Sequence, residues 1–224
     1  MAFFKVSHNE ESIKDRQGFN SISESGMYEV NIKHLLYNKS PNGSETLDIN
    51  FDYNGSNQTI WQAIRLTNND GSPNLENNNF NKLCIVAGAS EGVEISDPET
   101  VELNLTKEGA KQYAELMDLR DTEVIMRVQL EYSMYNGKIK MKKNIRNFFR
   151  VQDHATAAEI VNGTEVGKQY EEELKFADKV TYKDGLTPED VEQWKKDKAA
   201  GKDKETVEKE EVKGFKKASF KKAS

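Results

Sequence analysis

The segment Thr122–Arg150 has the sequence of a long β-hairpin. Asn136-Gly137 is a preferred dipeptide for a two-residue type I′ turn, because both central residues of that turn need positive φ. Apolar residues before the turn alternate with mainly polar ones, at Val124, Met126, Val128, Leu130, Tyr132 and Met134. This alternation is typical of a strand with one buried and one solvated face. We therefore expect an antiparallel sheet.

The turn also determines which residues share a face. In a two-residue loop Tyr135 lies opposite Lys138, and all other pairs follow. The exposed row of the second strand is then predicted to be Lys138, Lys140, Lys142, Asn144, Arg146, Phe148 and Arg150. The predicted core-facing row is Ile139, Met141, Ile145 and Phe149. Lys143 and Asn147 also fall on the core side, which indicates a bulge or a strand that leaves the core near its end.

Cations and an aromatic ring on one face suit a single-stranded nucleic acid, bound without sequence specificity, since Lys and Arg neutralise phosphates and rings stack on bases. Arg127 and Tyr135 are expected to extend this surface from the first strand. The pattern leaves one alternative open. The lysines could belong to a solvated strand, or protect a sheet edge from aggregation.

Further strands are predicted upstream at residues 27–37, 46–53 and 59–66. A helix is expected to follow, with Phe80, Leu83, Cys84 and Ala87 on one side and Gly88 at its end. After it we predict a short strand at 101–105 and a helical segment from 106 to 116. The order of strands and helix is that of an OB-fold, so we predict a mainly β protein with a five-stranded OB-fold-like barrel and its helix between strands 3 and 4.

We divide the chain into four parts. Residues 1–25 are a polar lead-in, 26–150 the OB-fold-like nucleic-acid-binding domain, 151–194 a helical extension, and 195–224 a disordered charged tail. The extension is expected to hold helices near 153–162 and 167–180, and a third that starts at Thr187-Pro188 and carries Trp194. The tail ends in two FKKAS copies from Phe215, which suggest either a solvated duplication or an electrostatic arm.

The formal net charge of -6 argues against polyanion binding over the whole surface, so a nucleic-acid site must be a local patch. Cys84 is the only cysteine, which excludes an internal disulfide and suits a reducing compartment. The start of the chain is too polar for a signal peptide, and no segment has the ~20 apolar residues of a membrane span. A cytoplasmic protein is the simplest expectation.

No catalytic constellation is recognisable in the sequence. His8, His34 and His154 stand in unrelated contexts, and Gly88–Gly92 lacks the GK[ST] ending of a phosphate-binding loop. Asp48, Asn50 and Asp52 share the predicted outward side of one strand, where a solvent face is more common than a cation site. We therefore predict no enzyme, metal or cofactor. That acidic row would repel phosphates, which leaves Trp61 and Arg65 as the strand 3 candidates for binding, although a Trp is more often buried.

Three parts of the sequence resemble a phage-encoded family that was first catalogued as a domain of unknown function. They are Ser25–Ile32, Leu47–Phe51, and the Asn-rich loop that leads into Phe80–Ala89. Members of this family are regarded as single-stranded DNA-binding proteins with an OB-fold, and the similarity covers roughly residues 20–150. It implies binding of single-stranded DNA during phage replication or recombination, alongside other proteins of those processes, in the host cytoplasm and without chemistry on the DNA.

One feature departs from that resemblance. Many phage and bacterial single-stranded DNA-binding proteins end in an acidic tail that recruits partners, whereas this chain ends in lysines that follow an acidic stretch, Glu205–Glu211. The acidic total charge also leaves a different class open, a virion or scaffold protein without a nucleic-acid role. A nuclease or strand-annealing enzyme ranks last, because no metal-ligand cluster is recognisable. The sequence leaves the oligomeric state open.

Overall fold

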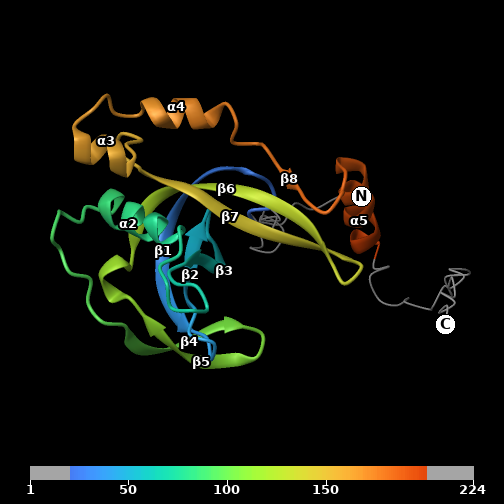
Figure 1. The fold of residues 1–224 in the computed structure, drawn as a ribbon, viewed down its shortest axis with the longest axis horizontal. Helices are drawn as coiled ribbons and strands as arrows, with labels where there is room; N and C mark the ends of the chain where they lie inside the picture. Colours follow the sequence, from blue (N-terminus) through green and yellow to red (C-terminus); the bar gives the residue numbers. More distant parts are fainter. Residues whose placement is uncertain (1–20, 201–224) are drawn as a thin grey trace, which may run out of the picture.

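The computed structural model describes residues 21–200 and shows a mainly β protein with a few short helices (Figure 1). Eight strands form one open sheet, antiparallel except where β8 joins it. The strands are β1 (Gly26–Lys39), β2 (Glu45–Tyr53), β3 (Ser56–Arg65), β4 (Glu99–Thr106), β5 (Gly109–Glu115), β6 (Thr122–Tyr135), β7 (Lys138–Arg150) and β8 (Thr181–Tyr182). The helices are α2 (Asn77–Val86), the 3-10 turn η1 (Met117–Leu119), α3 (Ala157–Asn162), α4 (Lys168–Leu174) and α5 (Pro188–Ala199).

Strand β1 is shared by two parts of the sheet. It pairs with β2 along most of its length, while its other edge pairs first with β6 and then with β5. A bulge at Lys33 makes this change of partner easier, because one extra residue bends a strand and increases its twist. Ile32 and Leu35, on either side of the bulge, are both fully buried. The three predicted upstream strands are confirmed as the meander β1–β2–β3.

The main core lies between this meander, α2 and the first half of the hairpin β6–β7. Helix α2 contributes Leu83, Cys84 and Val86, as its apolar spacing predicted. The helix ends at Gly88 (φ 101°), where the Ala89 N–H donates to the Cys84 carbonyl and the Gly88 N–H to the Ile85 carbonyl. This is a Schellman motif, so the predicted helix stop is confirmed.

The prediction of a helical segment at 106–116 is wrong. Gly109–Glu115 is strand β5, which pairs with β4 beyond a tight turn where Thr106 lies opposite Gly109. Gly109 has a φ of 95°, a conformation that suits glycine and favours the reversal. Lys, Gln and Ala favour helices locally, but pairing with β4 and with the end of β1 overrides this weak preference.

The hairpin register agrees with the prediction from the turn. Tyr135 pairs with Lys138, and Asn136 and Gly137 have φ values of 50° and 71°. The expected bulge is also present. Arg127 pairs with Asn147 but Val128 with Ile145, so Arg146 is the extra residue.

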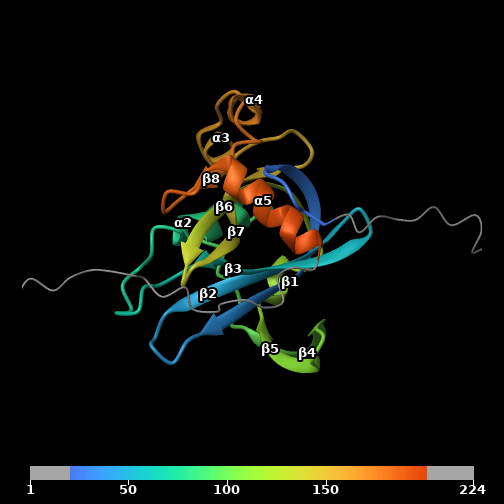
Figure 2. The same ribbon diagram turned by 90° about the vertical axis from the view of Figure 1, so that its right-hand side faces the viewer.

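The C-terminal helices lie on the hairpin at separate places (Figure 1). Helices α3 and α4 lie toward the end of the hairpin that is far from its turn, while α5 lies near the turn and crosses in front of β6 and β7 in Figure 2. Val191 and Trp194 of α5 pack on Leu130, Tyr132 and Ile139 in a second, smaller core. Thr187 and Asp190 form the capping box at the start of α5, as expected.

The described part of the chain departs from the predicted domain scheme in three ways. The strands do not close into a barrel, because β3 and β7 approach each other but are not paired. Ile22, within the predicted lead-in, is buried in the main core. Helix α5 continues to Ala199, inside the segment predicted to be disordered. The FKKAS pair, Glu205–Glu211 and His8 lie outside the described residues, and no described helix is long and apolar enough to cross a membrane.

Candidate nucleic-acid interface

Four cationic side chains lie along β7 between the hairpin turn and the bulge, and we call them the basic face. They are Lys138, Lys140, Lys142 and Arg146, and all four are exposed. The three lysines are paired across the hairpin with Tyr135, Ser133 and Glu131. Since side chains at i, i+2 and i+4 of a strand point to the same side, the predicted lysine row is placed as expected.

The charges of the basic face are not offset by ion pairs with carboxylates within residues 21–200. The Arg146 Nε donates to the neutral Gln129 Oε1 at 2.6 Å, which orients the guanidinium and leaves its charge in place. Two other cations of the hairpin do have carboxylate partners. Arg127 lies 2.8 Å from a Glu173 carboxylate oxygen, and Arg150 lies 2.6 Å from one of Asp153.

Phe148 was predicted to be exposed on the basic face, and this is wrong. It is fully buried in the main core opposite Met126. The physical reason is the bulge, because an extra residue at Arg146 reverses the alternation for the rest of β7. Phe149, predicted to face the core, turns instead to the opposite side and packs edge-on against Tyr170 of α4, with ring centroids 5.2 Å apart.

Arg127 and Arg150 do not extend the basic face either. The Arg127 guanidinium is mostly covered by α4 and the residues after it, and it also donates to the carbonyl of Phe176, which follows α4. Arg150 follows the bulge and so points to the other side of the sheet, where its ion pair with Asp153 raises the pKa of Arg150. Asn147 donates to Glu173, so that α4 closes this end of the basic face.

The three remaining predicted residues are exposed but divided between two strands. Tyr135 is 64% exposed at the turn end of the basic face, where it can offer a ring to a base. Trp61, 46% exposed, and Arg65 lie on β3, which is not paired with β7. The structure therefore brings together Tyr135 and the four cations, and leaves Trp61 and Arg65 on a separate strand.

Lys143 lies on the other side of β7, opposite Leu130, and it stays on the core-facing side as the register predicted. It is half-buried, and burial lowers the pKa of its ammonium group. The bulge therefore accounts for Asn147 but not for Lys143. Nothing else in the described structure explains a lysine at this position.

Glu131 lies on β6 opposite Lys142, and its partner was not predicted from the sequence. The Lys183 Nζ lies 2.9 Å from Glu131 Oε1, and Lys183 follows β8, far along the chain. Strand β8 runs parallel to β6 and pairs at Glu131 and Tyr132. A strand of two residues carries no periodic sequence signal, so this approach was not predictable.

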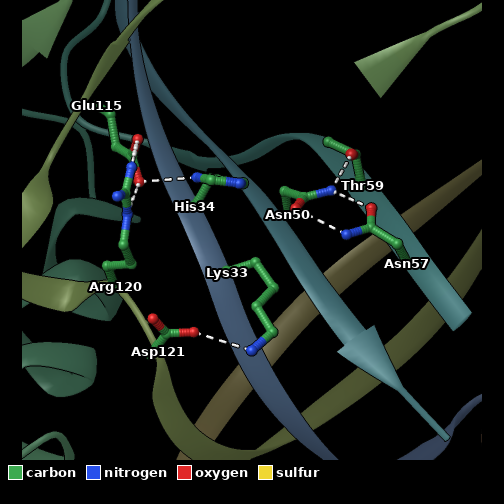
Figure 3. Close-up of polar contacts among 8 residues, drawn as sticks. All are labelled: Lys33, His34, Asn50, Asn57, Thr59, Glu115, Arg120 and Asp121. Carbon is green, nitrogen blue, oxygen red and sulfur yellow. Dashed lines mark hydrogen bonds and ion pairs between the residues drawn. The ribbon is translucent and has the colours of Figure 1, made fainter. Parts of the chain in front are cut away.

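A second polar cluster lies around β1 (Figure 3). The fully buried Glu115 carboxylate accepts from Arg120 at 2.9 Å and 2.5 Å, and its Oε1 lies 2.9 Å from His34 Nδ1. Lys33 pairs with Asp121 at 2.9 Å. These contacts tie η1 and β5 to β1, so we assign the cluster a structural role.

Asp48 and Asn50 of β2 were predicted to face solvent, and for both residues this is wrong. Asn50 is fully buried and donates to Asn57, Thr59 and the Gln58 carbonyl (Figure 3). Asp48 is 4% exposed, and its carboxylate accepts from Asn38 and from the Gln62 backbone N–H. Burial raises the pKa of Asp48 despite these bonds. Polar side chains that satisfy one another across strands can be buried, and alternation alone does not reveal it.

The other features of the described residues provide no reactive group. Burial raises the pKa of Cys84 to about 11, so its thiol is a poor nucleophile at neutral pH. A hollow of about 570 Å³ between α3, α4 and β7 is lined by both signs of charge, including Lys82, Lys168 and Glu172. Residues 21–200 contain no group of three His, Cys, Asp or Glu side chains that could hold a metal ion.

Comparison with known proteins adds no identification, since the chain matches no family model and no curated protein.

Proposed function

We propose that this protein binds single-stranded DNA without chemistry on it, through the basic face of the hairpin β6–β7. The observation that carries the proposal is the row of four cations, none of which has a carboxylate partner in residues 21–200. Segment Thr122–Arg150 holds seven Lys and Arg residues against two Glu, in a chain of net charge -6. Charge of this sign at one place attracts a polyanion to that place.

The spacing of the lysines supports an extended strand as the ligand. Alternate residues of a β-strand lie about 6.8 Å apart, so Lys138, Lys140 and Lys142 present three ammonium groups at regular intervals. Successive phosphates of an extended single strand repeat at a comparable distance. Tyr135 then lies where a base at one end of the row can stack.

The connectivity supports a finer description of the fold. The meander β1–β2–β3, helix α2, and a hairpin whose first strand pairs with β1 follow one another as in an OB-fold, with β4–β5 as an inserted hairpin. We propose that the domain is an OB-fold variant whose gap between β3 and β7 is left open. With the resemblance at residues 20–150, this suggests a role in phage DNA replication or recombination, in the cytoplasm of the host.

Titration of a labelled oligo-dT with the full-length protein at rising salt tests the proposal. Four phosphate contacts predict that log K falls with log salt at a slope of about −3 for a single strand. Absence of binding at low salt, or a slope near zero, would rule the proposal out. Size exclusion of the same samples tests the alternative, because self-assembly that is indifferent to the oligonucleotide favours a virion or scaffold protein.

Reversing the charge of one lysine tests whether the basic face is the binding site. Lys140→Glu should weaken binding roughly tenfold for every sequence and reduce the salt slope by about one, because it removes one phosphate contact. Lys107→Glu is the matched control, since Lys107 is exposed in the turn between β4 and β5 and away from the hairpin. Equal losses in the two variants would show that only the total charge matters.

A further inference from the structure

The β6 residues beside the basic face differ in chemistry from the cations of β7. Lysines 138, 140 and 142 lie on β7, whereas their cross-strand neighbours on β6 are Tyr135, Ser133 and Glu131. Gln129 continues the β6 row opposite Asn144. Directly opposite side chains of an antiparallel pair have Cβ atoms about 5 Å apart. A strand bound along the lysines therefore extends its other side over the β6 row.

Glu131 is held in place within that row. Its Oε1 lies 2.9 Å from Lys183 Nζ, its Oε2 accepts from Asn144 Nδ2 at 3.2 Å, and its side chain is 16% exposed. Each carboxylate oxygen has two lone pairs, so both can still accept from a ligand. The carboxylate is thus oriented by β7 and by the residue after β8 before any ligand arrives.

A carboxylate accepts hydrogen bonds only, and that of Glu131 is already paired with Lys183. Phosphates are attracted to the lysines of β7, whereas a group that bonds to the free lone pairs of Glu131 must offer N–H. Cytosine offers its N4 amino group, and guanine offers an imino N–H beside an amino group. Thymine offers one imino N–H, but this group lies between two carbonyl oxygens, and a carboxylate repels those oxygens. Carboxylates accordingly pair with cytosine in known base readout.

We infer that Glu131 is a specificity-determining residue, which accepts from the base of a nucleotide whose phosphate lies on the lysine row. The ligand class is a single strand with cytosine or guanine at one position, and strands made only of thymine bind more weakly. This inference rests on the proposed function and adds base preference to it. Tyr135, by contrast, stacks on any base.

The test compares the affinities of the full-length protein for oligo-dC, oligo-dT and an alternating dT-dG strand of equal length. We expect wild type to bind oligo-dC and the dT-dG strand about fivefold more tightly than oligo-dT, the lower range of a base-specific hydrogen bond. Glu131→Gln should reduce both ratios toward one, although removal of a negative charge should tighten binding of all three. Glu123→Gln is the matched control, because Glu123 is exposed on the same side of β6 beyond the lysine row.

The outcomes separate the two ideas. Salt-dependent binding with equal affinities in wild type would overturn the inference and leave the proposed function standing. A preference that survives in Glu131→Gln, or that Glu123→Gln removes equally well, would also overturn it. Failure of all three strands to bind wild type at low salt would overturn the proposed function itself.

Discussion

Two aromatic residues of the hairpin, Phe148 and Tyr135, differ completely in burial. Phe148 is fully buried and Tyr135 is 64% exposed, although the sequence pattern placed both on one surface. Phe148→Ala should lower the free energy of unfolding by about 3–5 kcal/mol, because it leaves a cavity in the main core. Tyr135→Ala should change it by no more than about 0.5 kcal/mol. Urea unfolding of both variants measures this difference.

In an oligonucleotide-binding assay we expect the direct loss of affinity to come from Tyr135→Ala, because only Tyr135 is exposed beside the basic face. Tyr135→Ala should weaken oligonucleotide binding by about 1–3 kcal/mol, the usual contribution of one stacked base. If Tyr135→Ala binds as wild type does, no base stacks on this ring. If Phe148→Ala is as stable as wild type, the assigned bulge at Arg146 is wrong.

Asp48 makes a pH-dependent contribution to stability. Burial raises its pKa in the folded protein above the unfolded value, about 3.9. The folded state therefore holds the proton more tightly, and this stability is present below the unfolded pKa and lost as pH rises through the folded pKa. Urea unfolding from pH 3.5 to 7 should show wild type losing stability relative to Asp48→Asn as pH rises.

A control of opposite sign is available at Asp118, whose pKa is lowered by hydrogen bonds from Ser96. Relative to Asp118→Asn, wild type should gain stability as pH rises through the same range, since a lowered folded pKa stabilises above the unfolded value. Identical trends for both variants would contradict the assignment for Asp48.

The residues that the sequence located correctly are those fixed by local rules. Lys138, Lys140 and Lys142 follow directly from the turn at Asn136-Gly137, because register is counted from the turn. Phe148 was misplaced because the bulge at Arg146 depends on how the strand packs against α4 and the core. Likewise, the burial of Asn50 depends on partners on another strand.

At the scale of elements, α2 is determined by its local sequence, whereas β5 is determined by the strands with which it pairs. Helix α2 carries its own stop signal at Gly88 and an apolar side, so its sequence was sufficient to predict it. Strand β5 has helix-favouring residues and becomes a strand through pairing with β4 and β1. The apolar positions of α5 are few, and its position on the hairpin was not predictable.

The attachment of α5 depends on one aromatic cluster. Trp194 lies 6.0 Å from Tyr132 between ring centroids, and Tyr132 stacks on Tyr182 of β8. Trp194→Ala should release α5, because Val191 and the Lys195 ammonium, 5.5 Å from the Tyr132 ring centroid, are weaker contacts of the helix with the second core. Hydrogen exchange should then show fast exchange in α5 and unchanged protection in β1 and β2, which belong to the main core.

Capping at the start of α5 provides the comparison for that variant. Thr187→Ala removes the capping box and should cost about 1 kcal/mol of helix stability while the aromatic contacts remain. It should therefore increase exchange in α5 less than Trp194→Ala does. Equal effects of the two variants would mean that the packing of Trp194 on Tyr132 does not hold the helix in place.

At the scale of the whole molecule, the sequence predicted a mainly β protein and the meander, but not the open sheet. Closure requires β3 and β7 to pair, and these strands are distant in the chain. The C-terminal segment also contains the short strand β8, which was not predicted, and β8 and α5 attach this segment to the hairpin. Both results depend on long-range packing, which local periodicity does not contain.

The closure of the basic face by α4 sets the length of strand that the proposed function allows the face to hold. From Lys138 to Arg146 the face runs for about 26 Å at ~3.3 Å per residue, after which Asn147 contacts Glu173. This length holds about four nucleotides, the low end of known site sizes. Affinity for oligo-dT should rise steeply up to that length and only slowly beyond it. Under the proposed function, one protein would cover only a few nucleotides, so coating a long strand would take one copy for every few nucleotides.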